Sequence, residues 1–147
     1  MDISETYIKM SGKAEEIQKL WVPTNGDFCW HDNEGEEVYG SWEYPAQVST
    51  VNISQETPKD WWYNWLWLPR QDQLQDMVKG FESDSLTLQY KFMEWCIPYF
   101  SAKGKYIYQW YVVSKTSMEQ LWLAFVMKEL YNKVWGGENW KLHECLD

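Results

Sequence analysis

The apolar positions of the chain recur either at helical spacing or in the alternation of a strand. The longest stretch with helical spacing runs from Thr116 to Gly137. Residues Leu121–Met127 are apolar without a break, so the first half of this helix is predicted to be apolar on all sides. In the second half the apolar positions narrow to one stripe that reaches Val134. Such a helix is expected to begin inside a core and to end at a surface.

Residues at the two ends of this stretch predict where the helix begins and ends. Thr116 is the predicted N-cap, and Glu119 stands three positions on, where the acid of a capping box is found. Gly136 and Gly137 follow the last apolar residue, and glycine is common in the left-handed turn that ends a helix. We therefore expect the longest helix of the fold to lie in this C-terminal stretch.

Three other stretches have helical spacing, namely Ala14–Trp21, residues 70–80 and Ser83–Cys96. Asp72 and Asp76 lie one turn apart on the second of them. We interpret this pair as a solvated face, because an acid–base pair would need one carboxylate in an apolar pocket. Residues 1–12 are mostly polar and predict no element, although Tyr7, Ile8 and Met10 could anchor them to a core.

Four stretches have the composition of strands, namely Phe28–Trp42, Val48–Ile53, Trp61–Leu68 and Tyr106–Val113. The first is predicted to form a hairpin, because its turn contains Asn33 and Gly35, which tolerate positive φ. The third is apolar on both alternate faces, which predicts a central strand covered on both sides. A last short strand is expected near Trp140. The sequence therefore predicts an α+β fold, a small and mostly antiparallel sheet packed with about three helices, in one domain of residues 1–147.

Aromatic content and charge set this chain apart from an average globular protein. It has 12 tryptophans, more than one core of this size is expected to need, so some are predicted to lie at a docking surface. The formal net charge is −9, and Arg70 is the only arginine, which suits phosphate or base recognition poorly. No stretch is long and apolar enough to span a membrane. Neither nucleic acid nor a membrane is therefore an expected partner.

The aromatic row in Trp61–Leu68 is the first candidate for a ligand or partner contact. In an extended strand, the side chains that share one face could stack on a base, a nucleotide or a sugar ring. Burial in the core is the competing and preferred interpretation, because large apolar residues are usually buried. The row consists of Trp61, Tyr63, Trp65 and Trp67.

Two short triplets bring cysteine and histidine together. Residues i and i+2 of a strand share a face, so each triplet could offer two ligands to zinc or form part of a thiol–imidazole dyad. Structural zinc sites usually place two to four residues between ligand cysteines, and each triplet has one intervening residue, which argues against zinc. No cofactor is therefore expected. The candidate ligands are Cys29, His31, His143 and Cys145.

Other motifs that would signal a catalytic or cation site are missing from the sequence. The predicted hairpin turn carries four carboxylates, but without the EF-hand pattern a solvated turn is the better interpretation. No nucleophile elbow, P-loop or dinucleotide fingerprint occurs. The chain is therefore expected not to be an enzyme. The turn carboxylates are Asp32, Glu34, Glu36 and Glu37.

Six segments carry a resemblance to other proteins: Tyr7–Met10, Ala14–Gln18, Gly26–Phe28, Trp67–Met77, Ser117–Leu130 and Lys133–Trp140. Together they resemble a group of short phage and prophage proteins of Gram-positive bacteria that has no assigned activity. The resemblance implies a phage or prophage origin and expression in a bacterial cytoplasm. Three cysteines and no secretory signal also favour a reducing cytoplasm. No functional residue is carried over from the group.

Three hypotheses of function follow from these observations. The first is a non-catalytic accessory protein that binds a host or phage macromolecule, with inhibition of a host defence as one form of that role. A protein partner is expected, and self-association stays open. The second is a small-ligand binder that stacks a nucleotide-like ring on the aromatic row. The third is a zinc- or thiol-dependent enzyme that uses the cysteine and histidine triplets.

Overall fold

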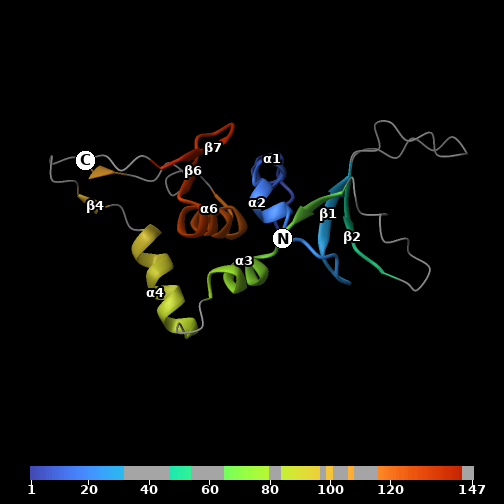
Figure 1. The fold of residues 1–147 in the computed structure, drawn as a ribbon, viewed down its shortest axis with the longest axis horizontal. Coiled ribbons are helices and arrows are strands. Elements are labelled where there is room, and N and C mark those ends of the chain that lie inside the picture. Colours follow the sequence, from blue (N-terminus) through green and yellow to red (C-terminus); the bar gives the residue numbers. More distant parts are fainter. Residues whose placement is uncertain are drawn as a thin grey trace, which may run out of the picture. The chain divides into compact units, whose positions relative to one another are not determined.

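A computed structural model describes residues 1–31, 47–53, 65–79, 84–96, 99–100, 106–107 and 116–143. Helices and short antiparallel sheets follow one another along the chain, so the fold is α+β, as the sequence predicts (Figure 1). The described residues divide into two compact units, which are residues 3–70 and residues 71–147 together with Met1 and Asp2. The expected single domain stays a prediction.

The unit of residues 3–70 begins with two helices, α1 (Glu5–Lys13) and α2 (Glu15–Gln18). Helix α1 was not predicted, because its first turns are mostly polar. Ser4 caps it by accepting a hydrogen bond from the backbone N–H of Tyr7, and Tyr7 and Met10 are buried one turn apart. Helix α2 is shorter than the predicted Ala14–Trp21 and leaves Leu20 exposed.

Three strands form the sheet of this unit, in the order β2-β1-β3 and antiparallel throughout. Their bounds are Phe28–His31 for β1, Gln47–Thr50 for β2 and Leu66–Leu68 for β3. Cys29 lies between Ser49 on one neighbour and Trp67 on the other. The strand predicted to start the hairpin is therefore confirmed at Phe28–His31, while the rest of that hairpin and its four carboxylates lie outside the described residues.

The prediction of a central strand at Trp61–Leu68 is wrong for the part that the structure describes. Strand β3 is at an edge, and the central strand among the described residues is β1. The outer edge of β3 is closed by the side-chain amide of Gln18, which accepts from the Trp67 N–H and donates to the Trp67 carbonyl, each at 3.0 Å. An amide that pairs with both groups acts as a one-residue substitute for a further strand.

In the other unit, α3 (Gln71–Val78) packs against α6 (Met118–Tyr131). Helix α3 agrees with the predicted helix at residues 70–80, and Leu74 is its buried residue. Asp72 and Asp76 are exposed, as expected for a solvated face. Helix α6 is buried from Trp122 to Met127, which confirms that its first half lies inside a core.

Both predicted ends of α6 need correction. The N-cap is Ser117, not Thr116: its hydroxyl accepts from the Gln120 N–H at 3.1 Å and bonds the Asp2 carboxylate. The helix ends at Asn132, which takes the left-handed conformation with φ 51°, and not at Gly136. Asparagine tolerates this conformation better than most residues do, so it can end a helix without glycine.

The residues after Asn132 turn back in a hairpin of β6 (Lys133–Trp135) and β7 (Trp140–Leu142). Val134 therefore belongs to a strand and not to the helical stripe that was predicted. Gly137, with φ 93°, lies in the connecting turn. Strand β7 confirms the expected last strand near Trp140.

Helix α4 (Ser85–Cys96) confirms the helix predicted at Ser83–Cys96. Two short strands follow it, β4 (Tyr99–Phe100) and β5 (Tyr106–Ile107), which pair antiparallel. Strand β5 agrees with the start of the predicted Tyr106–Val113 strand, and the rest of that stretch lies outside the described residues.

Candidate interaction surface

One face of α4 packs into the aromatic core of its unit. Leu88 and Phe92 are buried, with Trp95 one turn further on. The Phe92 ring stacks on Trp122 of α6 with 3.9 Å between ring centroids and 7° between planes. Phe125 meets Phe92 edge-on at 5.5 Å. This interlocked set of rings fixes which side of α4 faces inward.

The opposite face of α4 is apolar too, and it is exposed. Leu86, Tyr90 and Met93 have exposed fractions of 82%, 64% and 55%. They stand at i, i+4 and i+7, so they form one row along the helix. With about 100° per residue, this row lies opposite Leu88 and Phe92. We call Leu86, Tyr90 and Met93 the outer stripe.

Acidic side chains lie at both ends of the outer stripe. Asp84 is exposed before the first turn, where its carboxylate accepts from the Thr87 N–H at 2.7 Å. This hydrogen bond lowers the pKa of Asp84. Glu94 follows Tyr90 by one turn and accepts a hydrogen bond from its hydroxyl, which raises the pKa of Tyr90. The outer stripe is therefore an apolar row between two carboxylates.

Among the residues that the structure describes, the tryptophans do not supply the exposed surface that their number predicts, and the expectation stays a prediction for the other four. Eight of the twelve lie in the described part of the chain, and each of these eight is buried or half-buried. The large apolar residues that are exposed there are aliphatic residues, methionines and Tyr90. The described tryptophans are Trp21, Trp30, Trp65, Trp67, Trp95, Trp122, Trp135 and Trp140.

The predicted aromatic row is described only at Trp65 and Trp67, since Trp61 and Tyr63 lie outside the described residues. Trp67 is 5% exposed and lies parallel to Trp21 at 6.2 Å between centroids. Trp65 is half-buried and stacks on His31 at 4.6 Å. Both described members of the row therefore pack against other rings of their own unit.

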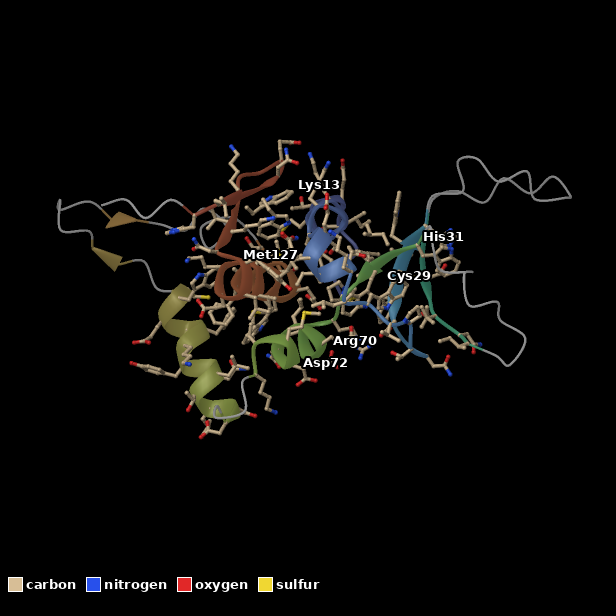
Figure 2. All side chains as sticks on the ribbon, viewed as in Figure 1. Lys13, Cys29, His31, Arg70, Asp72 and Met127 are labelled. Atoms are coloured by element: carbon tan, nitrogen blue, oxygen red, sulfur yellow. The ribbon has the colours of Figure 1, made fainter. Side chains whose placement is uncertain are left out.

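Cys29 and His31 lie on the same side of β1, as the i, i+2 spacing predicts (Figure 2). His31 Nε2 is 3.0 Å from Ser49 Oγ, and the Cys29 thiol points at the Ser49 carbonyl at 3.5 Å. Burial, with a smaller contribution from Asp27, raises the pKa of Cys29 to about 12. The thiol is therefore protonated at neutral pH and is a poor nucleophile or metal ligand.

The other half of the predicted metal set is only partly described. His143 is half-buried after β7, and Cys145 lies outside the described residues. Within the described ranges, no three His, Cys, Asp or Glu side chains gather as metal ligands. The four-residue set stays a prediction.

The single arginine, Arg70, binds groups of its own unit. Arg70 donates to the Gly26 carbonyl at 3.1 Å and lies 3.7 Å from the Asp27 carboxylate. Asp27 is buried and also accepts from the Trp21 indole and the Thr24 N–H, each at 2.9 Å. Arg70 therefore has a structural contact that accounts for its position.

The sequence holds a signal that α4 has two apolar rows, although it does not show which of them faces the core. Residues 86–95 hold two apolar rows two positions apart, and together these rows mimic the alternation of a strand. When the residues are sorted by helical spacing, one row is assigned to the core and the second row has no assigned neighbour.

None of the helices in the described ranges is long and apolar enough to cross a membrane. No protein-family model, curated protein or solved structure matches the chain.

Proposed function

We propose that this chain is a non-catalytic accessory protein of phage or prophage origin that acts by binding a host or phage macromolecule in a bacterial cytoplasm. Inhibition of a host defence is one form that such binding would take. The resemblance to phage and prophage proteins supports the origin. The exposed outer stripe of α4 is the single observation that supports binding.

The outer stripe differs from scattered exposed apolar residues, which are normal on any protein. Three large side chains align along one helix, and each exposes more than half of its surface. The opposite face of the same helix is fixed by ring stacking, so α4 cannot rotate to bury the row without losing the contact of Phe92 with Trp122. Contiguous apolar surface of this kind is typical of a docking site.

The chemistry of the other candidates supports a role in binding more than one in catalysis. The Cys29 thiol has a raised pKa, whereas nucleophilic cysteines have lowered ones. Trp67 is enclosed by its neighbours and presents no open ring face for a nucleotide. These observations favour the binding hypothesis over the ligand-stacking and thiol-enzyme hypotheses.

A quantitative pull-down from bacterial lysate tests the proposal. The baits are the wild-type chain, the stripe variant Leu86→Glu/Met93→Glu and the control variant Leu20→Glu/Val22→Glu. The control adds the same charge at two exposed apolar residues of the other unit, with exposed fractions of 56% and 75%. Circular dichroism checks that all three baits are folded.

We expect the wild type and the control to capture at least one macromolecule in equal amounts. The stripe variant should capture about tenfold less of it, which corresponds to a loss of about 1.4 kcal/mol in binding free energy. A captured set that is the same for all three baits would contradict binding through α4.

A further inference from the structure

We propose that the outer stripe of α4 takes an amphipathic helix of a protein partner whose apolar seam is flanked by lysine or arginine. This inference rests on the proposed function and names the partner class for the same surface. Three observations carry it, which are the geometry of the row, its side-chain types and its charge.

The geometry of the row fits a helix better than a strand or a small molecule. The three side chains at i, i+4 and i+7 cover about 10 Å along the axis of α4, given a rise of about 1.5 Å per residue. A row of this length and straightness matches the apolar seam of a second helix, which anchors through positions at the same spacing. Helix–helix packing of this kind needs no cavity, only two complementary rows.

The side chains of the outer stripe are of types that suit an interface. Tyrosine and methionine are enriched at the centres of protein interfaces. Methionine adapts its shape to irregular neighbours, and Tyr90 combines a large ring with a hydroxyl that is bonded to Glu94. Leu86 is the most exposed of the three, so it gains most from being covered.

The charge around the stripe selects a basic occupant. Asp84 and Glu94 stand at its two ends, against the one lysine of α4, Lys91, and the chain as a whole carries a formal net charge of −9. A second copy would bring the same acidic ends and the same net charge to the contact, which costs free energy. An anionic membrane is repelled in the same way. Lysine or arginine beside the partner's seam would instead pair with Glu94 and Asp84.

The test uses two synthetic helical peptides with the full-length chain. Both have leucine at i, i+3, i+4 and i+7; one places lysine and the other glutamate at the flanking positions. Isothermal titration calorimetry at low and at physiological ionic strength measures the affinity. The protein variants are Leu86→Glu/Met93→Glu, the charge reversal Glu94→Lys, and the control Leu20→Glu/Val22→Glu.

We expect the lysine peptide to bind the wild type and the control alike, and the glutamate peptide to bind at least tenfold more weakly. The stripe variant should bind the lysine peptide at least tenfold more weakly than the wild type does. Non-specific charge attraction would predict tighter binding instead, because the variant is more acidic. Glu94→Lys should weaken binding of the lysine peptide and strengthen binding of the glutamate peptide. Lysine-peptide binding that the stripe variant leaves unchanged or strengthens would overturn the inference.

Two further measurements decide between other occupants of the stripe. Sedimentation velocity that shows a wild-type dimer dissociated by the stripe variant would assign a second copy and overturn the inference. Stripe-dependent co-sedimentation with neutral phosphatidylcholine vesicles would assign a lipid surface and overturn it too. If neither peptide binds while the pull-down still returns a stripe-dependent macromolecule, this inference fails and the proposed function stands. If neither peptide binds and the pull-down returns no stripe-dependent macromolecule, this inference and the proposed function both fail.

Discussion

Helices α4 and α6 are both apolar on more than one side, yet they differ in how much of that surface is covered. Helix α6 is enclosed from Trp122 to Met127, and it packs against α3 and stacks its Trp122 ring on Phe92 of α4. Helix α4 offers one face to the same ring cluster and leaves the outer stripe exposed. Apolar residues on two sides of a helix can thus mark a position inside a core, as in α6, or leave one apolar side exposed, as in α4, where we propose that a partner binds.

The largest expected effect is a difference in stability between substitutions in the ring cluster that α4 and α6 share and substitutions in the outer stripe. Trp122→Ala removes the ring on which Phe92 stacks, so it should lower the free energy of unfolding by about 3–5 kcal/mol. Leu86→Ala should change it by no more than about 0.5 kcal/mol, because the side chain is exposed. Urea unfolding followed by circular dichroism measures both. A loss of several kcal/mol for Leu86→Ala would show that the outer stripe is covered in the free protein.

The next effect concerns the start of α6. Ser117→Ala removes the hydroxyl that accepts from Gln120 and bonds Asp2, so it should cost about 1–2 kcal/mol of unfolding free energy. Thr116→Ala serves as the neighbouring control and should cost less, because Thr116 is not the cap. Equal losses for the two variants in urea unfolding would restore the capping role first predicted for Thr116.

A smaller effect is expected at the end of α6. Asn132 has φ 51°, and its side chain accepts from the Lys128 ammonium at 2.7 Å. Asn132→Ala should cost about 1 kcal/mol, because alanine lacks the short polar side chain that lets asparagine adopt the left-handed region and that bonds Lys128 and His143 here. Asn132→Gly should be better tolerated, since glycine adopts that conformation freely. Thermal unfolding of the pair checks the order, and a more stable alanine variant would contradict the assigned helix end.

The smallest effect is a pH dependence at the start of α4. The Thr87 N–H holds the pKa of Asp84 below the ordinary value of 3.8, so the capping contribution is present above that value and is lost as the pH falls through the lowered pKa. Asp84→Asn keeps a capping oxygen without the titration. The wild type should therefore lose stability relative to Asp84→Asn on acidification. Parallel stability curves for the two proteins in urea titrations from neutral to acidic pH would contradict this role.

The sequence predicted the elements whose pattern is set within one stretch of chain. The apolar run of α6, the stripe of α3 and the span of α4 all follow from local spacing. Helix α1 was missed, because it packs against β3, which is distant in sequence, and the buried Tyr7 donates to the Pro69 carbonyl there. The position of β3 at an edge was missed for a similar reason, since the amide of Gln18, 49 residues away, completes its hydrogen bonding.

The candidate site was harder to predict than the fold. The count of tryptophans drew attention to a docking role, but the eight described indole rings are buried or half-buried. The exposed row consists of Leu86, Tyr90 and Met93, which look like ordinary core residues in the sequence. Which apolar row of α4 faces inward depends on where Trp122 and Phe125 lie, and that information is absent from the local pattern.

Oxidative footprinting of the methionines tests the central claim most directly. In the free protein, Met93 and Met118 should oxidise readily and Met127 should be protected, because their exposed fractions are 55%, 44% and 0%. Addition of the saturating lysine-flanked peptide should protect Met93 while Met118, the internal control outside the outer stripe, reacts as before. Peptide binding that leaves the oxidation rate of Met93 unchanged would show that the outer stripe is not where the partner docks.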